Sequence, residues 1–213
     1  MTVVFLHAFP LDERMWEQQR TVVPDTVAPR LYGRGRTMDA WADSIAGETD
    51  GELVLVGASM GGYCALALAR LAPERVRAAL LLGARPDADS DERRAARAKT
   101  IELIRDKGPG ALWRDMVPKL FADERNADER LLFREQEGLT GAVEAIRDRE
   151  DSTEVARGLG NRVRFVVGEH DPFVSADELR EFDVREIAGA GHLANLERPD
   201  EFNELLQEFL TDV

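Results

Sequence analysis

The chain has 213 residues, of which 44% are hydrophobic and 7% aromatic, as is usual for a globular protein with a sizeable core. Its formal net charge is −13, which argues against a nucleic-acid partner because that function needs a basic face. The single cysteine, Cys64, allows no internal disulfide and fits a reducing compartment. We therefore expect a cytoplasmic protein in which Cys64 packs in the core.

The sequence contains no apolar run of membrane-spanning length, and its opening residues do not resemble a secretory signal. Cysteine and histidine do not cluster at metal-ligand spacing, and no glycine-rich dinucleotide-binding or phosphate-binding motif is present. We therefore expect no metal, no cofactor and no membrane partner, in a protein that is a monomer or a homodimer.

Strand-like and helix-like segments alternate along most of the chain, which is typical of a parallel sheet covered by helices. The stretch 53–56 is continuously apolar, as expected for a central strand buried on both faces. We expect about six strands, at residues 2–7, 26–31, 52–57, 76–83, 162–168 and 184–188. The helices expected with them are 38–48, 60–72, 175–182 and 196–211.

The alternation breaks between Arg85 and about Ser152, where a charged stretch predicts three or four helices. Open α/β sheets bind ligands at the carboxyl ends of their strands, so we expect this insertion to cover a binding site. The predicted division is a core of residues 1–84 and 153–213 and a helical insertion of residues 85–152.

Ser59 lies in the sequence Gly57-Ala58-Ser59-Met60-Gly61, between an expected strand and an expected helix. This context favours a nucleophile elbow over a chance match to G-x-S-x-G. Glycines keep Cβ atoms out of a crowded turn, and the start of a helix directs N–H groups at a developing oxyanion. We expect Ser59 to be a nucleophile; the alternative is a tight turn with an inert serine.

A serine nucleophile needs a base that takes its proton, and the chain has three histidines, His7, His170 and His192. His192 ends the glycine-rich turn that follows the strand expected at 184–188, a position where catalytic side chains are often carried. We expect His192 to be the base and His170 to be a neighbour of the acid.

The orienting acid is expected at the end of another strand. Asp171 follows the strand at 162–168 and precedes Pro172, which ends that strand. Glu169 is the rival acid, because residues two apart on an extended segment point to the same side. The order Ser59, Asp171, His192 is the order of the α/β-hydrolase triad.

With these residues the whole chain resembles the α/β-hydrolase superfamily, and within it the cap-bearing group of small esterases, enol-lactonases and cofactor-free haloperoxidase-like enzymes. The resemblance implies an α/β-hydrolase fold: a mostly parallel sheet with helices on both faces and a small helical cap at 85–152. The chain departs from the family in its first strands, where we expect the usual antiparallel hairpin to be missing. The stretch His7-Ala8-Phe9-Pro10 resembles the family's His-Gly-x-Pro motif, with Ala8 in place of glycine. The resemblance therefore implies an oxyanion hole made by the backbone N–H groups of Phe9 and Met60.

A small and mostly apolar substrate pocket is expected beneath the cap. The candidate substrate-binding residues are His7, Trp16, Trp113, Met116, Phe121 and Phe173, with Phe9, Met15 and Phe133 as further candidate walls.

The triad favours a serine hydrolase that cleaves a small ester, lactone or thioester through an acyl-enzyme on Ser59, with a small-molecule acyl substrate as its partner. Another reaction on the same triad stays open: carbon–carbon hydrolysis, a lyase reaction, acyl transfer or perhydrolysis. A third alternative is a non-catalytic binding protein, since a fold alone does not give a function. A dehalogenase or an epoxide hydrolase of the superfamily would carry aspartate in place of Ser59.

Overall fold

The computed structural model describes residues 1–213 and contains one six-stranded sheet in which every neighbouring pair of strands is parallel. The strands are β1 (Thr2–Leu6), β2 (Thr26–Val27), β3 (Leu53–Ala58), β4 (Val76–Leu82), β5 (Val163–Gly168) and β6 (Asp183–Ile187). Their order across the sheet is β2-β1-β3-β4-β5-β6. The chain runs from β1 outward to β2 and returns to β3 on the other side of β1, so the strand order reverses between β1 and β3. Such a switch point is where open α/β sheets bind ligands.

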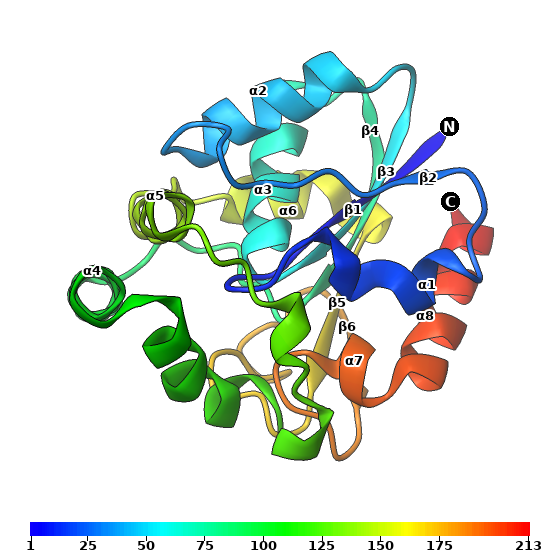
Figure 1. Ribbon diagram of the computed structural model, residues 1–213. Coiled ribbons are helices and arrows are strands. Elements are labelled where there is room, and N and C mark those ends of the chain that lie inside the picture. The colour runs from blue at the N-terminus through cyan, green and yellow to red at the C-terminus, as the bar shows by residue number, and fades with distance from the viewer.

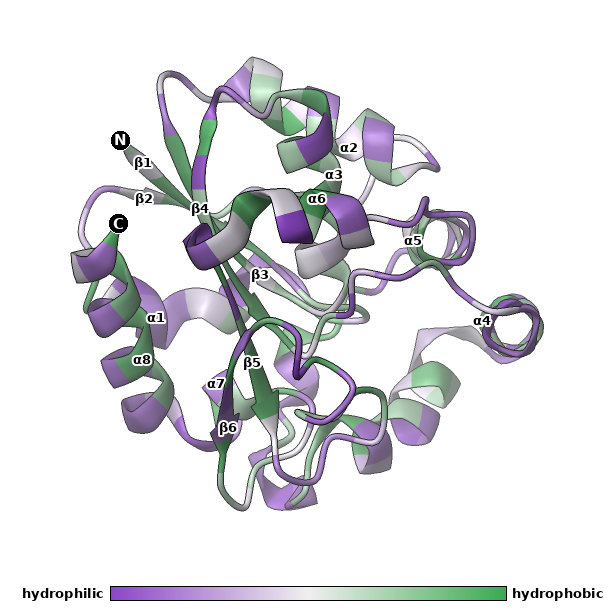
Figure 2. Ribbon diagram, turned by 180° about the vertical axis from the view of Figure 1, so that it is seen from behind, coloured by the Kyte–Doolittle hydropathy of each residue, from purple (hydrophilic) through white to green (hydrophobic).

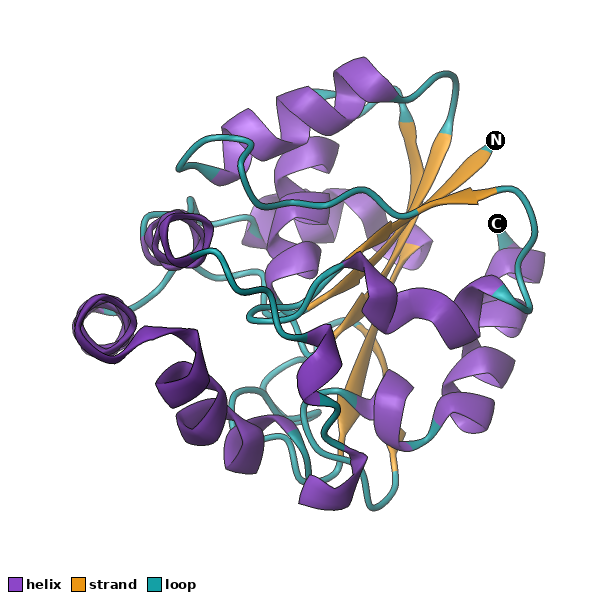
Figure 3. Cartoon of the chain, in the orientation of Figure 1, coloured by secondary structure: helices purple, strands orange, loops and turns teal.

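Helices cover both faces of the sheet. Helices α2 (Met38–Glu48), α3 (Met60–Leu71) and α6 (Thr153–Leu159) lie on one face, and α1 (Glu17–Arg20) and α8 (Pro199–Asp212) lie on the other (Figure 1, Figure 3). Along β1 the side chains alternate between two hydrophobic clusters: Val4 and Leu6 join the first, Val3 and Phe5 the second. The expected α/β fold with a parallel sheet is confirmed.

The hydropathy of the ribbon follows this layering. The central strands β3 and β5 are mainly hydrophobic, whereas the edge strand β6 and the outer helices carry many hydrophilic residues (Figure 2). None of the helices is both long enough and apolar enough to cross a membrane.

Residues 85–152 contain two long helices, which pack against each other on the side of the sheet towards which the strands point (Figure 1). Helix α4 (Asp91–Leu120) is interrupted at Gly108, whose φ of 73° suits glycine, and Pro109 begins its second half. Two 3₁₀ turns, η2 (Glu124–Asn126) and η3 (Glu129–Leu131), lead to α5 (Gln136–Arg147).

Two elements differ from those expected from the sequence: one is absent and the other is shorter. The stretch 175–182 forms turns and no helix. The Glu178 carboxylate accepts hydrogen bonds from both the N–H and the hydroxyl of Ser175, and the backbone N–H groups of this stretch donate to carbonyls three residues back instead of four. The strand expected at 26–31 ends at Val27. Pro29 has no N–H to donate to a neighbouring strand, and Leu31 donates its N–H to His7 Nε2 instead.

The expected C-terminal helix is divided at Arg198 into α7 (Ala194–Glu197) and α8. The sequence did not predict α1, α6 or the short 3₁₀ helices η1 (Glu13–Trp16) and η4 (Gly160–Arg162). All of these missed elements are shorter than two and a half turns, so their hydrophobic periodicity is weak.

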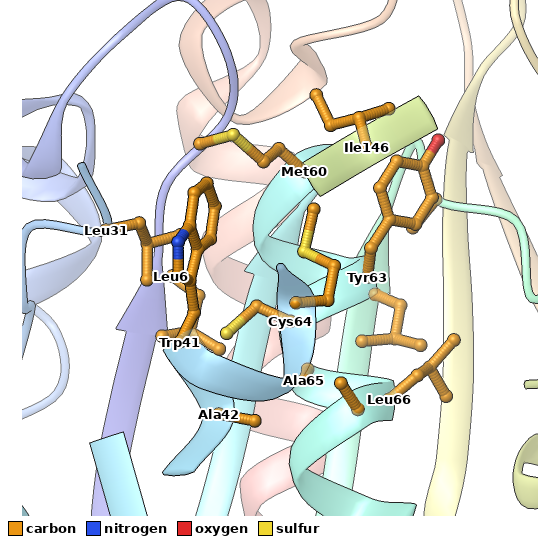
Figure 4. Packing of buried hydrophobic residues seen from close by; sticks show 14 of the residues in the cluster. Leu6, Leu31, Trp41, Ala42, Met60, Tyr63, Cys64, Ala65, Leu66 and Ile146 are labelled. Carbon is orange, nitrogen blue, oxygen red and sulfur yellow. The ribbon is translucent and has the colours of Figure 1, made fainter. Parts of the chain in front are cut away.

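Cys64 lies on α3 inside the first hydrophobic cluster, together with Leu6, Trp41 and Met60 (Figure 4). It is a free, fully buried thiol, and burial raises its pKa to about 12. A thiol with so high a pKa is unreactive, so Cys64 is a packing residue.

Candidate active site

Ser59 occupies a sharp turn between β3 and α3, with φ 49° and ψ −111°. Its N–H donates to the carbonyl of Leu82 in β4 at 2.7 Å, and its carbonyl accepts from Gly62 N at 2.9 Å. A positive φ outside glycine costs about 1–3 kcal/mol and persists only where neighbouring contacts impose it. The structure thus holds Ser59, the nucleophile expected from the sequence, in a strained backbone conformation.

Three glycines make this turn possible. A Cβ atom at Gly61 would lie 2.0 Å from the Leu6 carbonyl oxygen, and one at Gly57 would lie 2.6 Å from the Gly61 backbone. A Cβ atom at Gly62 would lie 2.4 Å from Ala84 Cβ. The first turn of α3 therefore packs directly on the end of β1, and any side chain at these positions would push Ser59 out of place.

His192 and Asp171 are joined by a hydrogen bond of 2.8 Å between Nδ1 and Oδ2. Both side chains are buried, with 3% and 0% exposed. Asp171 is held in turn by the Phe173 N–H, which donates to Oδ1 at 2.8 Å. With Nδ1 donating to Asp171, the other nitrogen, Nε2, is free to accept a proton.

The rival acid, Glu169, faces elsewhere. It is exposed, and its carboxylate accepts the Gly189 N–H at 2.8 Å, which fixes the turn before His192. The loops after β5 and β6 are also tied by the His170 N–H, which donates to the Ala190 carbonyl at 2.8 Å. Asp171 is thus the carboxylate that the structure brings to His192. The backbone N–H of His170, and not its side chain, helps to hold the two loops together.

The ring of His192 is confined on two sides. The Phe173 ring meets it edge-on with 4.7 Å between centroids. Gly83, at φ +57°, has its backbone so close that a Cβ atom would lie 2.8 Å from His192 Nδ1. The imidazole orientation is therefore set by packing as well as by the carboxylate.

The N–H groups of Phe9 and Met60 donate to no protein acceptor. Met60 is the first residue of α3, where N–H groups lack a helical partner and the helix dipole favours negative charge. The Ala8 methyl is fully buried in the second hydrophobic cluster, and the Ala8 N–H contacts Met15 Sδ at 3.1 Å. The alanine in place of the family's glycine is thus accommodated in the core.

Ser59 and His192 line one cavity of about 150 Å³. No hydrogen bond joins their side chains, and such bonds commonly tighten only when substrate binds. The other lining residues are Phe9, Tyr63, Arg85, Asp89, Arg93, Ala96, Arg97, Met116, Leu120, Ile146 and Phe173. The lining is therefore shared between the sheet ends and the 85–152 segment.

Three of the residues predicted from the sequence to form walls, Phe9, Met116 and Phe173, line this cavity. The others lie elsewhere, because their rings and side chains pack in the core. Trp16 contacts Phe5 with 5.1 Å between ring centroids. Trp113 meets Phe121 edge-on at 6.5 Å, in the second hydrophobic cluster.

His7 is also a core residue and not a cavity wall. Its Nε2 accepts the Leu31 N–H at 2.9 Å, and its ring lies 4.9 Å from that of Tyr32, on which Phe133 stacks at 3.9 Å. Burial lowers the pKa of His7 to about 4, so it is neutral near pH 7. Met15 likewise is buried and contacts the Ala8 N–H.

The charged residues that line the cavity were not predicted from the sequence. Asp89 precedes α4, and Arg93 and Arg97 follow it at intervals of four residues, so the three side chains lie on one face. This spacing is the feature of the sequence that could have indicated a shared charged surface. No three His, Cys, Asp or Glu side chains come together in a way that could hold a metal ion.

Comparison with known proteins gives matches over nearly the whole chain. Residues 3–205 match the model of the alpha/beta hydrolase family. A thermophilic esterase from Thermogutta terrifontis, in a malate-bound structure, is 31% identical with a TM-score of 0.90, over 100% of this chain and 90% of that chain. The enol-lactonase from Burkholderia xenovorans LB400 is 23% identical with a TM-score of 0.82, over 99% and 91% of the two chains, and shares the fold.

A shorter match links the chain to the pimeloyl-[acyl-carrier protein] methyl ester esterase of Aromatoleum aromaticum, with 33% identity over 93 residues. This match spans 39% of the present chain and 37% of that relative. The family model, by contrast, covers β1 to α8, including the elbow, the Asp171 and His192 loops and the 85–152 segment between them. The chain belongs to the alpha/beta hydrolase family of enzymes.

Proposed function

We propose that this enzyme is a serine hydrolase that cleaves a small ester or lactone through an acyl-enzyme on Ser59. The observation that carries the proposal is the meeting of Ser59 and the hydrogen-bonded pair His192–Asp171 at one cavity. The resemblance to an esterase at 31% identity over the full chain supports the same reaction class.

In the proposed mechanism, Ser59 Oγ attacks the substrate carbonyl while His192 Nε2 takes the hydroxyl proton. Asp171 holds the imidazole in the productive tautomer and stabilises the imidazolium that forms. The oxyanion receives hydrogen bonds from the N–H groups of Phe9 and Met60, neither of which has a protein acceptor.

His192 then protonates the leaving alkoxide, and the acyl group stays on Ser59. In the second half, His192 takes a proton from water, the hydroxide attacks the acyl carbonyl, and Ser59 leaves with the proton. The apolar walls, including Phe9, Met116 and Phe173, would exclude bulk water from the acyl group.

The test is hydrolysis of p-nitrophenyl acetate and butyrate by wild type and Ser59→Ala, with fluorophosphonate labelling followed by peptide mass mapping. We expect Ser59→Ala to lose activity by about 10⁴-fold or more and to lose the label. Ser44→Ala on α2 is the matched control, because Ser44 lies outside the cavity, bonded to Arg34. Labelling at another residue, or a fully active Ser59→Ala, would overturn the proposal.

A further inference from the structure

One wall of the cavity is rich in arginine although the chain as a whole is acidic, with a net charge of −13. Arg85, Arg93 and Arg97 line the same cavity as Ser59 and His192. A lining of this kind is unusual for a purely apolar acyl site, in which polar groups are few and placed for specificity.

Two of these arginines are each held by two or more hydrogen bonds to acceptors in the protein. Arg85 donates to the Asp87 carboxylate, to Glu178 and to the Phe173 carbonyl. Arg93 donates through Nη2 both to Asp87 and to the Ala88 carbonyl, while its buried Nε has no hydrogen-bond partner. These contacts make Arg85 and Arg93 mainly structural.

Arg97 differs from them. Its Nε donates to Asp89 Oδ2 at 3.1 Å, whereas Nη1 and Nη2 have no hydrogen-bond partner in the protein. The guanidinium is therefore fixed along one edge and keeps two parallel donors free. Such a fork matches the two oxygens of a carboxylate.

Asp89 is anchored well enough to hold Arg97 in place. Its side chain is fully buried, and Arg149 donates to the other carboxylate oxygen, Oδ1, at 2.6 Å. Arg149 is itself buried and lies over the Tyr63 ring at 4.1 Å. Since Tyr63 also lines the cavity, Asp89 links the arginine wall to the first turns of α3.

The charges of this wall do not balance. Three of the residues that line the cavity are cationic, Arg85, Arg93 and Arg97, and Asp89 is the only anionic one. The lining thus carries more positive than negative side chains at a partly enclosed wall, where low dielectric strengthens the attraction for an anion.

We propose that Arg97, positioned by Asp89, binds a carboxylate of the substrate, so that the enzyme prefers short esters or lactones that carry a carboxylate away from the scissile carbonyl. The proposal rests on the proposed hydrolase function and names its substrate class. The cavity of about 150 Å³ limits the spacing between the two groups to a short chain.

The test compares the monomethyl esters of succinate, glutarate and adipate with the corresponding dimethyl esters, by titration of released acid. The paired esters differ in one charge and one methyl group. We expect the best monomethyl ester to exceed its dimethyl partner in kcat/KM by about 10-fold or more, mainly through KM. Raising the salt concentration should reduce this ratio, because salt screens partly exposed charges.

The decisive variant is Arg97→Gln, which keeps hydrogen-bonding groups and removes the charge. We expect the ratio of monomethyl to dimethyl kcat/KM to fall by about 10-fold, and Arg97→Lys to restore only part of it. Lys99→Gln is the matched control: it removes the same charge from the same helix at an exposed residue outside the cavity lining, and should leave the ratio unchanged.

An independent measurement uses the wild-type enzyme alone. Glutarate should inhibit ester hydrolysis competitively at concentrations about 10-fold below those needed for glutaramide. If wild type favours the dimethyl esters, or if Arg97→Gln lowers both members of each pair equally, the carboxylate site is refuted. Neutral esters still cleaved through Ser59 would then leave the proposed hydrolase function standing, whereas loss of Ser59 dependence would overturn that function instead.

Discussion

The two walls of the cavity are built in different ways. The wall at the sheet ends holds Ser59 and His192 through backbone packing that leaves no free space, as at Gly61, where a Cβ atom would lie 2.0 Å from a carbonyl oxygen. The wall from residues 85–152, here called the helical wall, includes long side chains such as Arg97 and Met116, which are carried on helix α4. We infer that the first wall sets the chemistry and the second sets the selectivity, so each should respond to different substitutions.

The largest effect should follow from the sheet-end wall at Asp171. Asp171→Asn keeps the shape of the side chain but holds the imidazole in the wrong tautomer and cannot stabilise imidazolium. We expect kcat on p-nitrophenyl acetate to fall by about 10⁴-fold, the size of loss known for this change in a Ser-His-Asp triad. Circular dichroism should show an unchanged fold.

Glu169→Gln is the control for that variant. Its carboxylate contacts the Gly189 N–H and not His192, so the amide should lower kcat by less than about threefold. Were Glu169→Gln the inactive enzyme and Asp171→Asn the active one, the assignment of the acid would be wrong while the nucleophile could still stand.

The second prediction concerns His7, which lies two residues before Phe9 and whose Nε2 accepts the Leu31 N–H. Burial lowers the folded-state pKa of His7 from 6.5 to about 4, despite opposing influences from the Ala8 carbonyl and the charges of Glu13 and Asp12. Between these two pH values the unfolded chain binds more protons at His7 than the folded chain. Stability should therefore fall as the pH drops from about 6.5 to about 4, by about 3 kcal/mol in total.

Urea unfolding of wild type and His7→Gln at pH 7.5, 5.5 and 4 measures this contribution. The variant should be less stable at pH 7.5 but should lose less further stability on acidification, because it lacks the buried ionisable group. Equal pH slopes for the two proteins would assign the acid sensitivity to other groups.

The sequence predicted the sheet-end wall better than the helical wall, for physical reasons. The constraints at Ser59 are local: a strained turn needs glycines at fixed spacings, and these are visible in the sequence. Aromatic bulk at Trp16, Trp113 and Phe121 was a poor guide to cavity walls, because large apolar side chains fill cores as readily as pockets. Their direction depends on packing between distant elements.

The arginine wall escaped prediction because a charged helix is normally a solvated surface. The position of Arg97 at the cavity depends on the buried Asp89, which pairs with both Arg97 and Arg149, and these two arginines are more than fifty residues apart in the sequence. The turns at 175–182 escaped for a similar reason, since side-chain contacts there replace helical ones. The division at 85–152, the cytoplasmic location and the monomeric or dimeric state stay predictions.

A third prediction separates steric support of His192 from simple backbone strain. At Gly83, with φ +57°, an alanine would place Cβ 2.8 Å from His192 Nδ1 and Cε1, so the imidazole must move. We expect kcat/KM to fall by about 10²-fold, as for a displacement of about 1 Å in a catalytic group. Gly160→Ala is the matched control, because Gly160 has φ +58° and no atom within 4 Å of the added Cβ.

Both glycine variants should lose about 1–2 kcal/mol of stability through the unfavourable φ, and only Gly83→Ala should lose activity. Thermal unfolding gives the first comparison and ester kinetics the second. If Gly160→Ala also lost activity, strain and not contact with the imidazole would explain the result.

The smallest effect should come from the helical wall at Met116, which lines the cavity from the second half of α4. Met116→Ala removes most of an apolar side chain while keeping a good helix former, so the helix should persist and the cavity should grow. We expect the kcat/KM ratio of p-nitrophenyl hexanoate to acetate to rise by up to about 10-fold, because each methylene added to an apolar pocket contributes binding energy.

Lys119→Ala is the control on the same helix, since Lys119 is exposed and pairs with Asp115 at 2.7 Å. An unchanged ratio in Met116→Ala would mean that this wall does not limit the acyl chain, and the contrast between the two walls would then rest on the arginines alone.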